Sequence, residues 1–253
     1  MRVIVLASQK GGSGKTTLAG HLAVEAERTG FAPVAIIDTD PQGSLQKWSE
    51  ARYADTPAYC ASDLASLRST LIRCRAEGYR LVVIDTPPSI TRAISDVLSF
   101  ADLVVMPTRP SPHDIRAVGL TVDLVDYHRK PMIFVINGAT PRARITSDAA
   151  VALSQHGTVA PTFMCHRVDY AASMIDGRTV QEVNPNGRSA REVIELWAYI
   201  AERLNRMDEV LNGVPDPSRF SPMMTSLSAF GRKQGAPGQP AAPVPPGATP
   251  GPG

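Results

Sequence analysis

Features that would place a chain of 253 residues in a specialised class are scarce in this sequence. It has three cysteines, Cys60, Cys74 and Cys165, which lie far apart and form no CxxC pair. This spacing argues against a disulfide framework, a zinc site or a self-contained iron–sulfur site. No apolar run approaches the roughly 18 residues of a membrane-spanning helix, and the N-terminal run is too short for a signal peptide. We therefore expect a cytosolic protein with reduced thiols.

A strong net charge is also missing, because 26 basic and 24 acidic residues leave a formal charge of +2. Any contact with nucleic acid must therefore come from a local patch of cations. Aromatic residues make up 6% of the chain and hydrophobic residues 43%. The core is expected to be aliphatic, and the length suits one large α/β domain or two small ones.

Proline and glycine are concentrated at the C-terminal end. Residues 213–253 contain 10 prolines and 7 glycines in 41 positions. Such a segment cannot bury enough apolar surface to offset the entropy of ordering it. We therefore predict a domain at residues 1–212 and a disordered tail at residues 213–253. Inside the tail, the more apolar segment 219–233 is either a docking peptide or part of a linker.

Residues 1–212 alternate short apolar runs with amphipathic stretches. The runs predict strands at 3–7, 34–38, 81–85, 103–107, 133–137 and 159–164. The amphipathic stretches predict helices at 15–29, 44–53, 63–77, 90–100, 114–128, 145–156 and 188–212. This alternation indicates an α/β fold with a doubly wound, mostly parallel sheet that carries helices on both faces. Ligands of such sheets bind at the carboxyl ends of the strands.

The strongest motif follows the first predicted strand and reads QKGGSGKTT over residues 9–17. Its glycines permit positive φ angles, so successive backbone N–H groups can converge on phosphate oxygens. A helix that begins near Gly14 adds the positive end of its dipole. Lys15 would reach the terminal phosphates of a nucleotide, and the Thr16 hydroxyl would bind Mg²⁺. The motif therefore predicts a phosphate-binding loop.

This loop departs from the pattern GxxxxGK[ST], because Lys10 stands where the first glycine is expected. In this it resembles the deviant Walker A motif of the ParA/MinD family of P-loop ATPases, and the resemblance covers about residues 1–205. Three further segments support it: IDTDPQGS at 37–44, VIDTPP at 83–88, and the late pair GRTV at 177–180 and GRSARE at 187–192. The DTDPQGS segment points to the ParA branch. The resemblance implies a small ParA-type ATP hydrolase with ATP and Mg²⁺ as cofactors, without a leading sequence-specific DNA-binding domain.

The resemblance also assigns roles to single residues. The nucleotide contacts would be Lys10, Gly11, Gly12, Ser13, Gly14, Lys15, Thr16, Thr17 and, at the adenine, Asn137, although a turn-forming asparagine is an open alternative. The catalytic residues would be Lys15, Asp40 as the residue that orients the attacking water, and Lys10, which would contact the nucleotide of a second chain. Thr16, Asp38 and Asp85 would hold the metal. The switch segments would contain Pro41, Gln42 and Gly43, and Thr86 and Pro87.

The output of such an ATPase is a separate question, because three classes share this scaffold. A reductase would need cluster-ligating cysteines near the dimer axis, and none follows Asp85 within the next predicted strand and helix. A MinD-like positioning ATPase bound to a membrane, the alternative reading, would need a C-terminal amphipathic helix, which the proline-rich tail disfavours. Nonspecific DNA binding is favoured by the basic stretch 167–206, with Arg167, Arg188 and Arg191 as candidate phosphate contacts.

The predicted protein is therefore a cytoplasmic, nucleoid-associated ATPase. It would form an ATP-dependent homodimer on nonspecific DNA, and a ParB-like protein or a cargo adaptor would stimulate its hydrolysis. The cargo would be a plasmid or chromosome centromere complex, or a protein cluster.

Overall fold

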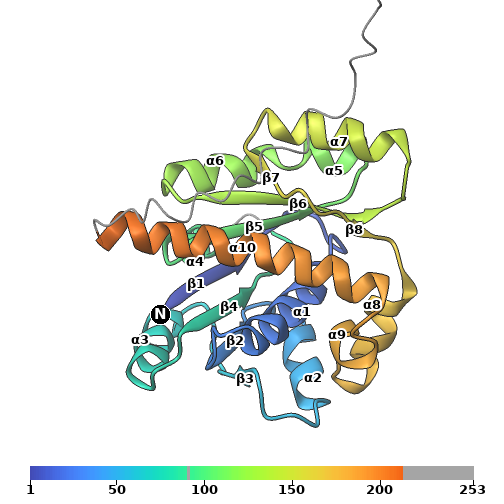
Figure 1. The fold of residues 1–253 in the computed structure, drawn as a ribbon. Helices are drawn as coiled ribbons and strands as arrows, with labels where there is room; N and C mark the ends of the chain where they lie inside the picture. Colours follow the sequence, from blue (N-terminus) through green and yellow to red (C-terminus); the bar gives the residue numbers. More distant parts are fainter. Residues whose placement is uncertain (90–91, 213–253) are drawn as a thin grey trace, which may run out of the picture. The chain divides into compact units, whose positions relative to one another are not determined.

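Parallel strand pairing organises the structure, a computed structural model that describes residues 1–89 and 92–212. The strands of the main sheet follow the order β3-β2-β4-β1-β5-β6-β7, and β8 pairs with β6 beside it (Figure 1). Every pair is parallel. β1 lies in the middle, between β4 and β5, so the loop that follows it emerges at the centre of the sheet's carboxyl edge. The predicted fold class is confirmed.

The strands are β1 (Arg2–Leu6), β2 (Val34–Asp38), β3 (Ala58–Tyr59), β4 (Leu81–Asp85), β5 (Leu103–Thr108), β6 (Met132–Ala139), β7 (Thr158–Val159) and β8 (Met164–Cys165). The helices are α1 (Lys15–Arg28), α2 (Ser44–Glu50), α3 (Leu67–Ala76), α4 (Arg92–Ser99), α5 (Pro112–Arg116), α6 (Gly119–Tyr127), α7 (Arg144–Ser154), α8 (Val168–Ser173), the 3₁₀ turn η1 (Met174–Asp176), α9 (Val180–Val183) and α10 (Arg188–Asn212).

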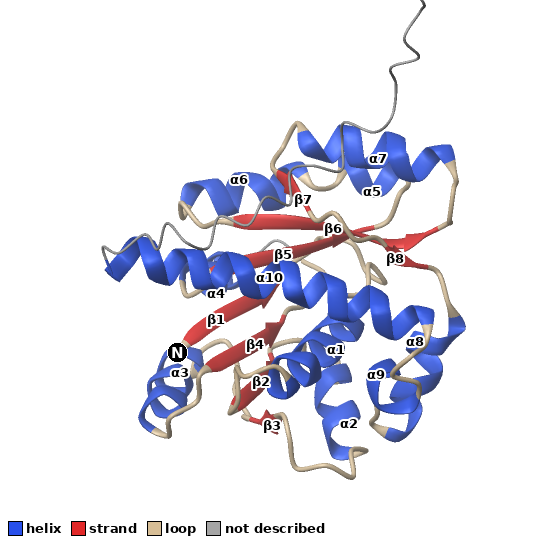
Figure 2. Cartoon of the chain, viewed as in Figure 1, coloured by secondary structure: helices blue, strands red, loops and turns tan. Residues whose placement is uncertain are grey.

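The sheet is buried on both faces because consecutive side chains of each strand enter different cores. In β1, Ile4 and Leu6 pack with α1, α2 and α10, whereas Val3 and Val5 pack with α3, α4, α6 and α7. Figure 2 shows the two helical layers around the sheet. This explains why β2, β4 and β5 read as continuous apolar runs rather than alternating ones. In the described residues, no helix is long and apolar enough to cross a membrane.

The structure agrees with the predicted bounds of β2, β4 and α10, and the ends of most other predicted elements differ by one to four residues. Two predictions differ in kind. The predicted strand 159–164 is wrong, because β7 and β8 are separate pairs of residues on either side of Pro161, which has no N–H for a strand ladder. The predicted helix 114–128 is two helices, α5 and α6, and the second begins at Gly119, a residue of low helix propensity.

Four short elements were not predicted: β3, α8, η1 and α9. They have two, six, three and four residues, too few to display a hydrophobic period. The proposed tail 213–253, including the segment 219–233, lies outside the described residues, so its disorder stays a prediction.

Candidate nucleotide-binding site

The loop between β1 and α1 has the backbone that a phosphate-binding loop requires. Gly12 has φ 68° and Gly14 has φ 100°, both in the left-handed region that favours glycine. Gly14 is also crowded, because a Cβ added there would lie 2.0 Å from the Nδ2 of Asn137. Gly11 differs, since its φ is not positive and a Cβ there would meet no atom within 4 Å. The steric need for glycine therefore rests on Gly12 and Gly14.

The two lysines of the loop lie in different environments. Lys15 is 6% exposed, and its Nζ donates to the backbone oxygens of Ser8 (3.2 Å) and Lys10 (3.4 Å). Burial lowers the pKa of Lys15, an effect that the nearby carboxylates of Asp85 and Asp40 oppose. Lys10 is exposed, and within the described residues its side chain has no hydrogen-bond or ion-pair partner. Lys15 thus belongs to the interior of the loop, whereas Lys10 is accessible from outside.

A carboxylate lies beside the start of α1. The Thr16 Oγ1 donates to Oδ2 of Asp85, at the end of β4, over 2.5 Å. Asp85 is 1% exposed, and this burial raises its pKa to about 7, while the hydrogen bond from Thr16 works in the opposite direction. Together these residues offer a hydroxyl and a carboxylate side by side, which are oxygen ligands suited to Mg²⁺.

Two buried atoms of this region have no hydrogen-bond partner among the described residues: the Asp85 Oδ1 and the Ser13 Oγ. Buried polar atoms are rarely unpaired, so such a pair calls for an explanation. Both lie where a nucleotide phosphate and its metal would supply partners. The described residues hold no cluster of three or more His, Cys, Asp or Glu side chains that could bind a metal.

Asp38 and Asp40 have different surroundings although only one residue separates them. The Asp38 carboxylate is 5% exposed and accepts three backbone N–H groups, from Asp40 (2.9 Å), Leu45 (2.8 Å) and Gln46 (3.1 Å). It thereby caps the N-terminus of α2 and fixes the turn before it. Asp40 is half-buried, and its Oδ1 accepts the N–H of Gln42 (3.0 Å). Of the two, Asp40 has the carboxylate with capacity left for a water.

The predicted switch residues lie next to this carboxylate cluster. Pro41 and Gln42 are exposed, and Gly43 has φ 64°, a left-handed turn that precedes α2. On the neighbouring strand, the hydroxyl of Thr86 donates to the Leu6 backbone oxygen over 2.7 Å, which ties the chain after β4 to the end of β1. A shift of the backbone after β4 would therefore move the end of β1, where the phosphate loop begins.

Comparison with known proteins identifies the family. Residues 4–180 match the CobQ/CobB/MinD/ParA nucleotide binding domain. The chain belongs to this family. It is 31% identical over 224 residues to the maintenance of carboxysome distribution protein A of Gloeobacter kilaueensis, a match that covers 81% of this chain and 94% of that protein. It is 28% identical over 202 residues to the protein of the same name from Halothiobacillus neapolitanus, with 76% and 92% covered.

The fold has solved counterparts in the ParA/MinD family. The ATP complex of a Cyanothece McdA variant superposes with a TM-score of 0.67 at 18% identity, over 81% of this chain and 96% of that one. The family of P-loop ATPases indicated by residues 9–17 is therefore confirmed, and the parallel sheet with its helices is the ParA/MinD fold.

Two sequence-predicted residues have contacts that the ParA/MinD resemblance alone does not reveal. Asn137, at the carboxyl end of β6, donates its Nδ2 to the Ser13 backbone oxygen over 2.6 Å, so it supports the phosphate loop. Its adenine contact stays a prediction. Arg167 donates to Glu192 over 2.8 Å, and Glu192 also accepts the N–H of Cys165 and the hydroxyl of Tyr170. Arg167 thus belongs to a hydrogen-bonded network that joins α8 to α10.

Arg109 was missed by the sequence analysis. It follows β5, and one of its guanidinium nitrogens lies 3.2 Å from the position that a Gly12 Cβ would occupy. The guanidinium is exposed and has no ion-pair partner within the described residues. The available signal was a basic residue directly after a strand next to β1, but the predicted strand stopped at Pro107, one residue before the end of β5.

Proposed function

We propose that this chain is a small ParA-type ATPase that dimerises with ATP, binds DNA without sequence preference and positions a cargo through stimulated hydrolysis. The observation that carries the proposal is the difference in burial and contacts between the two loop lysines. Lys15 is buried within its own loop, whereas Lys10 is exposed and unpaired in the described part of the chain. Because the Lys10 ammonium has no partner within the described residues, it is available to contact the nucleotide of a second subunit.

The chemistry proposed for the site follows from the contacts of the loop and of the strand ends. The N–H groups of the glycine loop and the Lys15 ammonium would bind the phosphates. Thr16 and Asp85 would hold Mg²⁺, which would neutralise phosphate charge. Asp40 would orient the attacking water, and Asp38 supports that role because it fixes the turn carrying Asp40. Lys10 of the partner chain would add positive charge where the transferred phosphoryl group develops negative charge.

The proposed DNA contacts are Arg188 and Arg191, at the start of α10. Both are exposed, neither forms an ion pair within the described residues, and a spacing of three brings them to neighbouring positions on one helix face. Phosphate contacts of this kind carry affinity without reading sequence. Arg167 is left out of this proposed surface because its guanidinium is engaged by Glu192.

The cargo is proposed as a class rather than as one object. The two relatives named above are maintenance proteins of carboxysome distribution, which favours a protein body. A plasmid or chromosome centromere complex is the other member of the class. In either case we propose that a ParB-like or adaptor protein stimulates hydrolysis, and that the ATPase is cytoplasmic and nucleoid-associated.

The experiment that tests this proposal compares duplex DNA of unrelated sequences with anionic liposomes, each in the presence of ATP and of ADP. We expect ATP-dependent binding to all duplexes with similar affinity and a steep decrease with salt. Arg188→Glu should weaken binding to every duplex, whereas Arg75→Glu, the same charge reversal at an exposed position of α3, should not. Liposome binding without DNA binding would refute the proposal in favour of a MinD-like membrane ATPase.

A further inference from the structure

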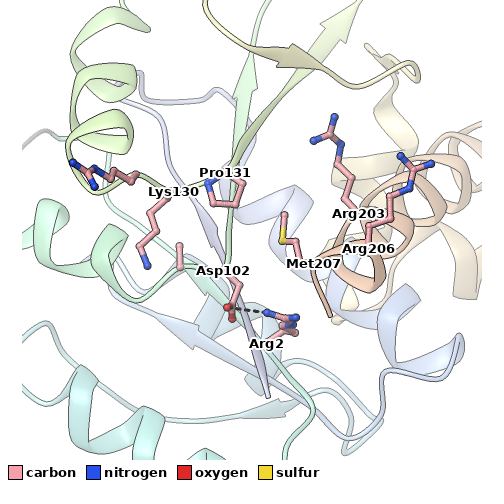
Figure 3. A pocket seen from close by; sticks show the side chains of 9 residues that line it. Arg2, Asp102, Lys130, Pro131, Arg203, Arg206 and Met207 are labelled. Atoms are coloured by element: carbon pink, nitrogen blue, oxygen red, sulfur yellow. Dashed lines mark hydrogen bonds and ion pairs between the residues drawn. The ribbon is translucent and has the colours of Figure 1, made fainter. Parts of the chain in front are cut away.

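A basic pocket lies far from the nucleotide site. It has a volume of about 570 Å³ and opens where β1, β5 and β6 begin, beside the C-terminal half of α10 (Figure 3). Of its nine lining residues, five are cationic, one is acidic and three are apolar. The five cations are Arg2, Arg129, Lys130, Arg203 and Arg206.

The single lining carboxylate does not neutralise this pocket. Asp102 accepts the Val3 N–H over 2.8 Å and a guanidinium N–H of Arg2 over 3.2 Å, so both of its oxygens are used at the pocket floor. Arg129 and Lys130 form no ion pair within the described residues. Arg203 lies over the Tyr199 ring and donates to its hydroxyl, which is neutral. Arg206 pairs with Glu202, a residue of α10 that does not line the pocket. Arg129, Lys130 and Arg203 therefore leave a positive excess, which a bound anion would reduce.

Arg129 is held in an unfavourable backbone conformation at the rim. Its φ is 51°, and it terminates α6, with its N–H donating to the Asp126 backbone oxygen. Glycine is preferred at such a helix end, and a side chain there costs about 1 kcal/mol. The Arg129 side chain is nevertheless exposed and lines the pocket, where it can pair with an anion.

The centre of the pocket is apolar. In Figure 3, Pro131 and Met207 lie between Lys130 on one side and Arg203 and Arg206 on the other. A DNA backbone would use the cations and leave this apolar centre without a partner. A peptide with an apolar side chain between carboxylates would match both features.

We propose that this pocket is a docking site for an acidic peptide segment of a partner protein. An apolar side chain of that segment packs between Pro131 and Met207, and its carboxylates pair with Arg129 and Lys130. The site does not depend on the proposed nucleotide chemistry. Arg2 begins β1 and the phosphate loop follows the end of that strand, which separates the two sites by on the order of 15 Å.

The test uses a fluorescent, glutamate-rich peptide with leucine at its centre as the probe, measured by anisotropy. Arg129→Gly should weaken its binding about two- to fivefold, as expected for one exposed ion pair. Glycine suits φ 51°, so the variant should stay folded. The matched control is Arg142→Gly, because Arg142 is an exposed arginine with φ 61° that follows β6, at the opposite edge of the sheet. Met207→Ser should also weaken binding, and a glutamine version of the peptide should not bind.

Equal binding of the acidic peptide to Arg129→Gly and Arg142→Gly would overturn the proposal. Evidence that the pocket binds another kind of ligand would overturn it as well. If Arg129→Gly loses affinity for duplex DNA, or for phosphatidylglycerol vesicles, while peptide binding is unchanged, the pocket is a nucleic-acid or membrane contact instead.

Discussion

The hydroxyl of Thr16 donates to one carboxylate oxygen of Asp85 over 2.5 Å, while the other oxygen is buried without a partner in the described structure. The bond joins the first turn of α1 to the end of β4, two elements that are 69 residues apart in sequence. One oxygen is thus positioned by the protein and the other is available. This is the arrangement that a magnesium ion or one of its waters would complete.

From this relationship we predict that Thr16→Ala removes the benefit of Mg²⁺ for nucleotide binding. The variant loses a hydroxyl ligand and also the partner that orients Asp85. The measurement is the affinity for a fluorescent ATP analogue with Mg²⁺ and with EDTA. The ratio of these two affinities should be about tenfold smaller in Thr16→Ala than in the unmodified protein, a loss typical of one charge-assisted contact. Thr16→Ser keeps the hydroxyl and should keep most of the effect. An unchanged response to Mg²⁺ in Thr16→Ala would place the metal elsewhere.

Lys15 and Lys10 should differ when each is replaced by alanine. Lys15→Ala should lower nucleotide affinity on the order of 100-fold, because the phosphates lose the buried ammonium of their own loop. Lys10→Ala should retain nucleotide but fail to form ATP-dependent dimers. Equilibrium binding and light scattering with ATP measure the two effects. If Lys10→Ala dimerises and hydrolyses normally, Lys10 is a surface lysine.

Asp40→Ala should separate binding from hydrolysis. The carboxylate of Asp40 is not part of the helix cap made by Asp38, so the fold should be retained. Hydrolysis in a single turnover should slow by about 10²- to 10⁴-fold, since the attacking water is no longer oriented. The trapped ATP dimer should stay on DNA. Asp55→Ala, which removes an exposed aspartate, is the control, and equal rates in the two variants would assign Asp40 to the turn alone.

The pH dependence of stability should carry a contribution from His21. This residue of α1 is fully buried, with its Nδ1 2.7 Å from the Thr17 backbone oxygen and its Nε2 accepting the N–H of Val180 over 3.2 Å. Burial lowers its pKa to about 4. Below about pH 6.5 the unfolded chain therefore binds a proton that the folded chain does not, and stability falls as the pH decreases toward 4.

The size of this contribution is on the order of 3 kcal/mol between pH 7 and pH 4. Urea unfolding at several pH values measures it. His21→Gln cannot titrate, so its free energy of unfolding should change less over this range, while the contributions of the carboxylates cancel in the comparison. Parallel pH curves for the two proteins would show that His21 is protonated in the folded state or that it contributes nothing.

Local patterns were enough to predict the sheet, the phosphate loop and the family. The strand at 81–85 is apolar at every position before Asp85, and the glycines of residues 11–14 stand directly between an apolar run and a helical stretch. Such patterns depend on near neighbours in the chain. Short elements such as α9 were not found this way, because four residues show no hydrophobic period. The Thr179–Glu182 capping box is a local signal for the start of α9, but the packing of α9 against α1 and α10 depends on the fold.

What the sequence determined by itself is the kind of site: a P-loop of the ParA/MinD type with an aspartate at the end of each of two strands. The tertiary structure decided how the side chains divide the work. In the folded chain, Asp38 accepts three backbone N–H groups, Asn137 donates to the Ser13 carbonyl, and Arg167 forms an ion pair with Glu192. The fold also gathers the pocket cations from β1, the end of α6 and α10. Asn137 and Ser13 are 124 residues apart and Arg167 and Glu192 are 25 apart, whereas the partners of Asp38 lie two to eight residues from it. No local pattern encodes the two distant pairings, because they form only when the fold brings these segments together.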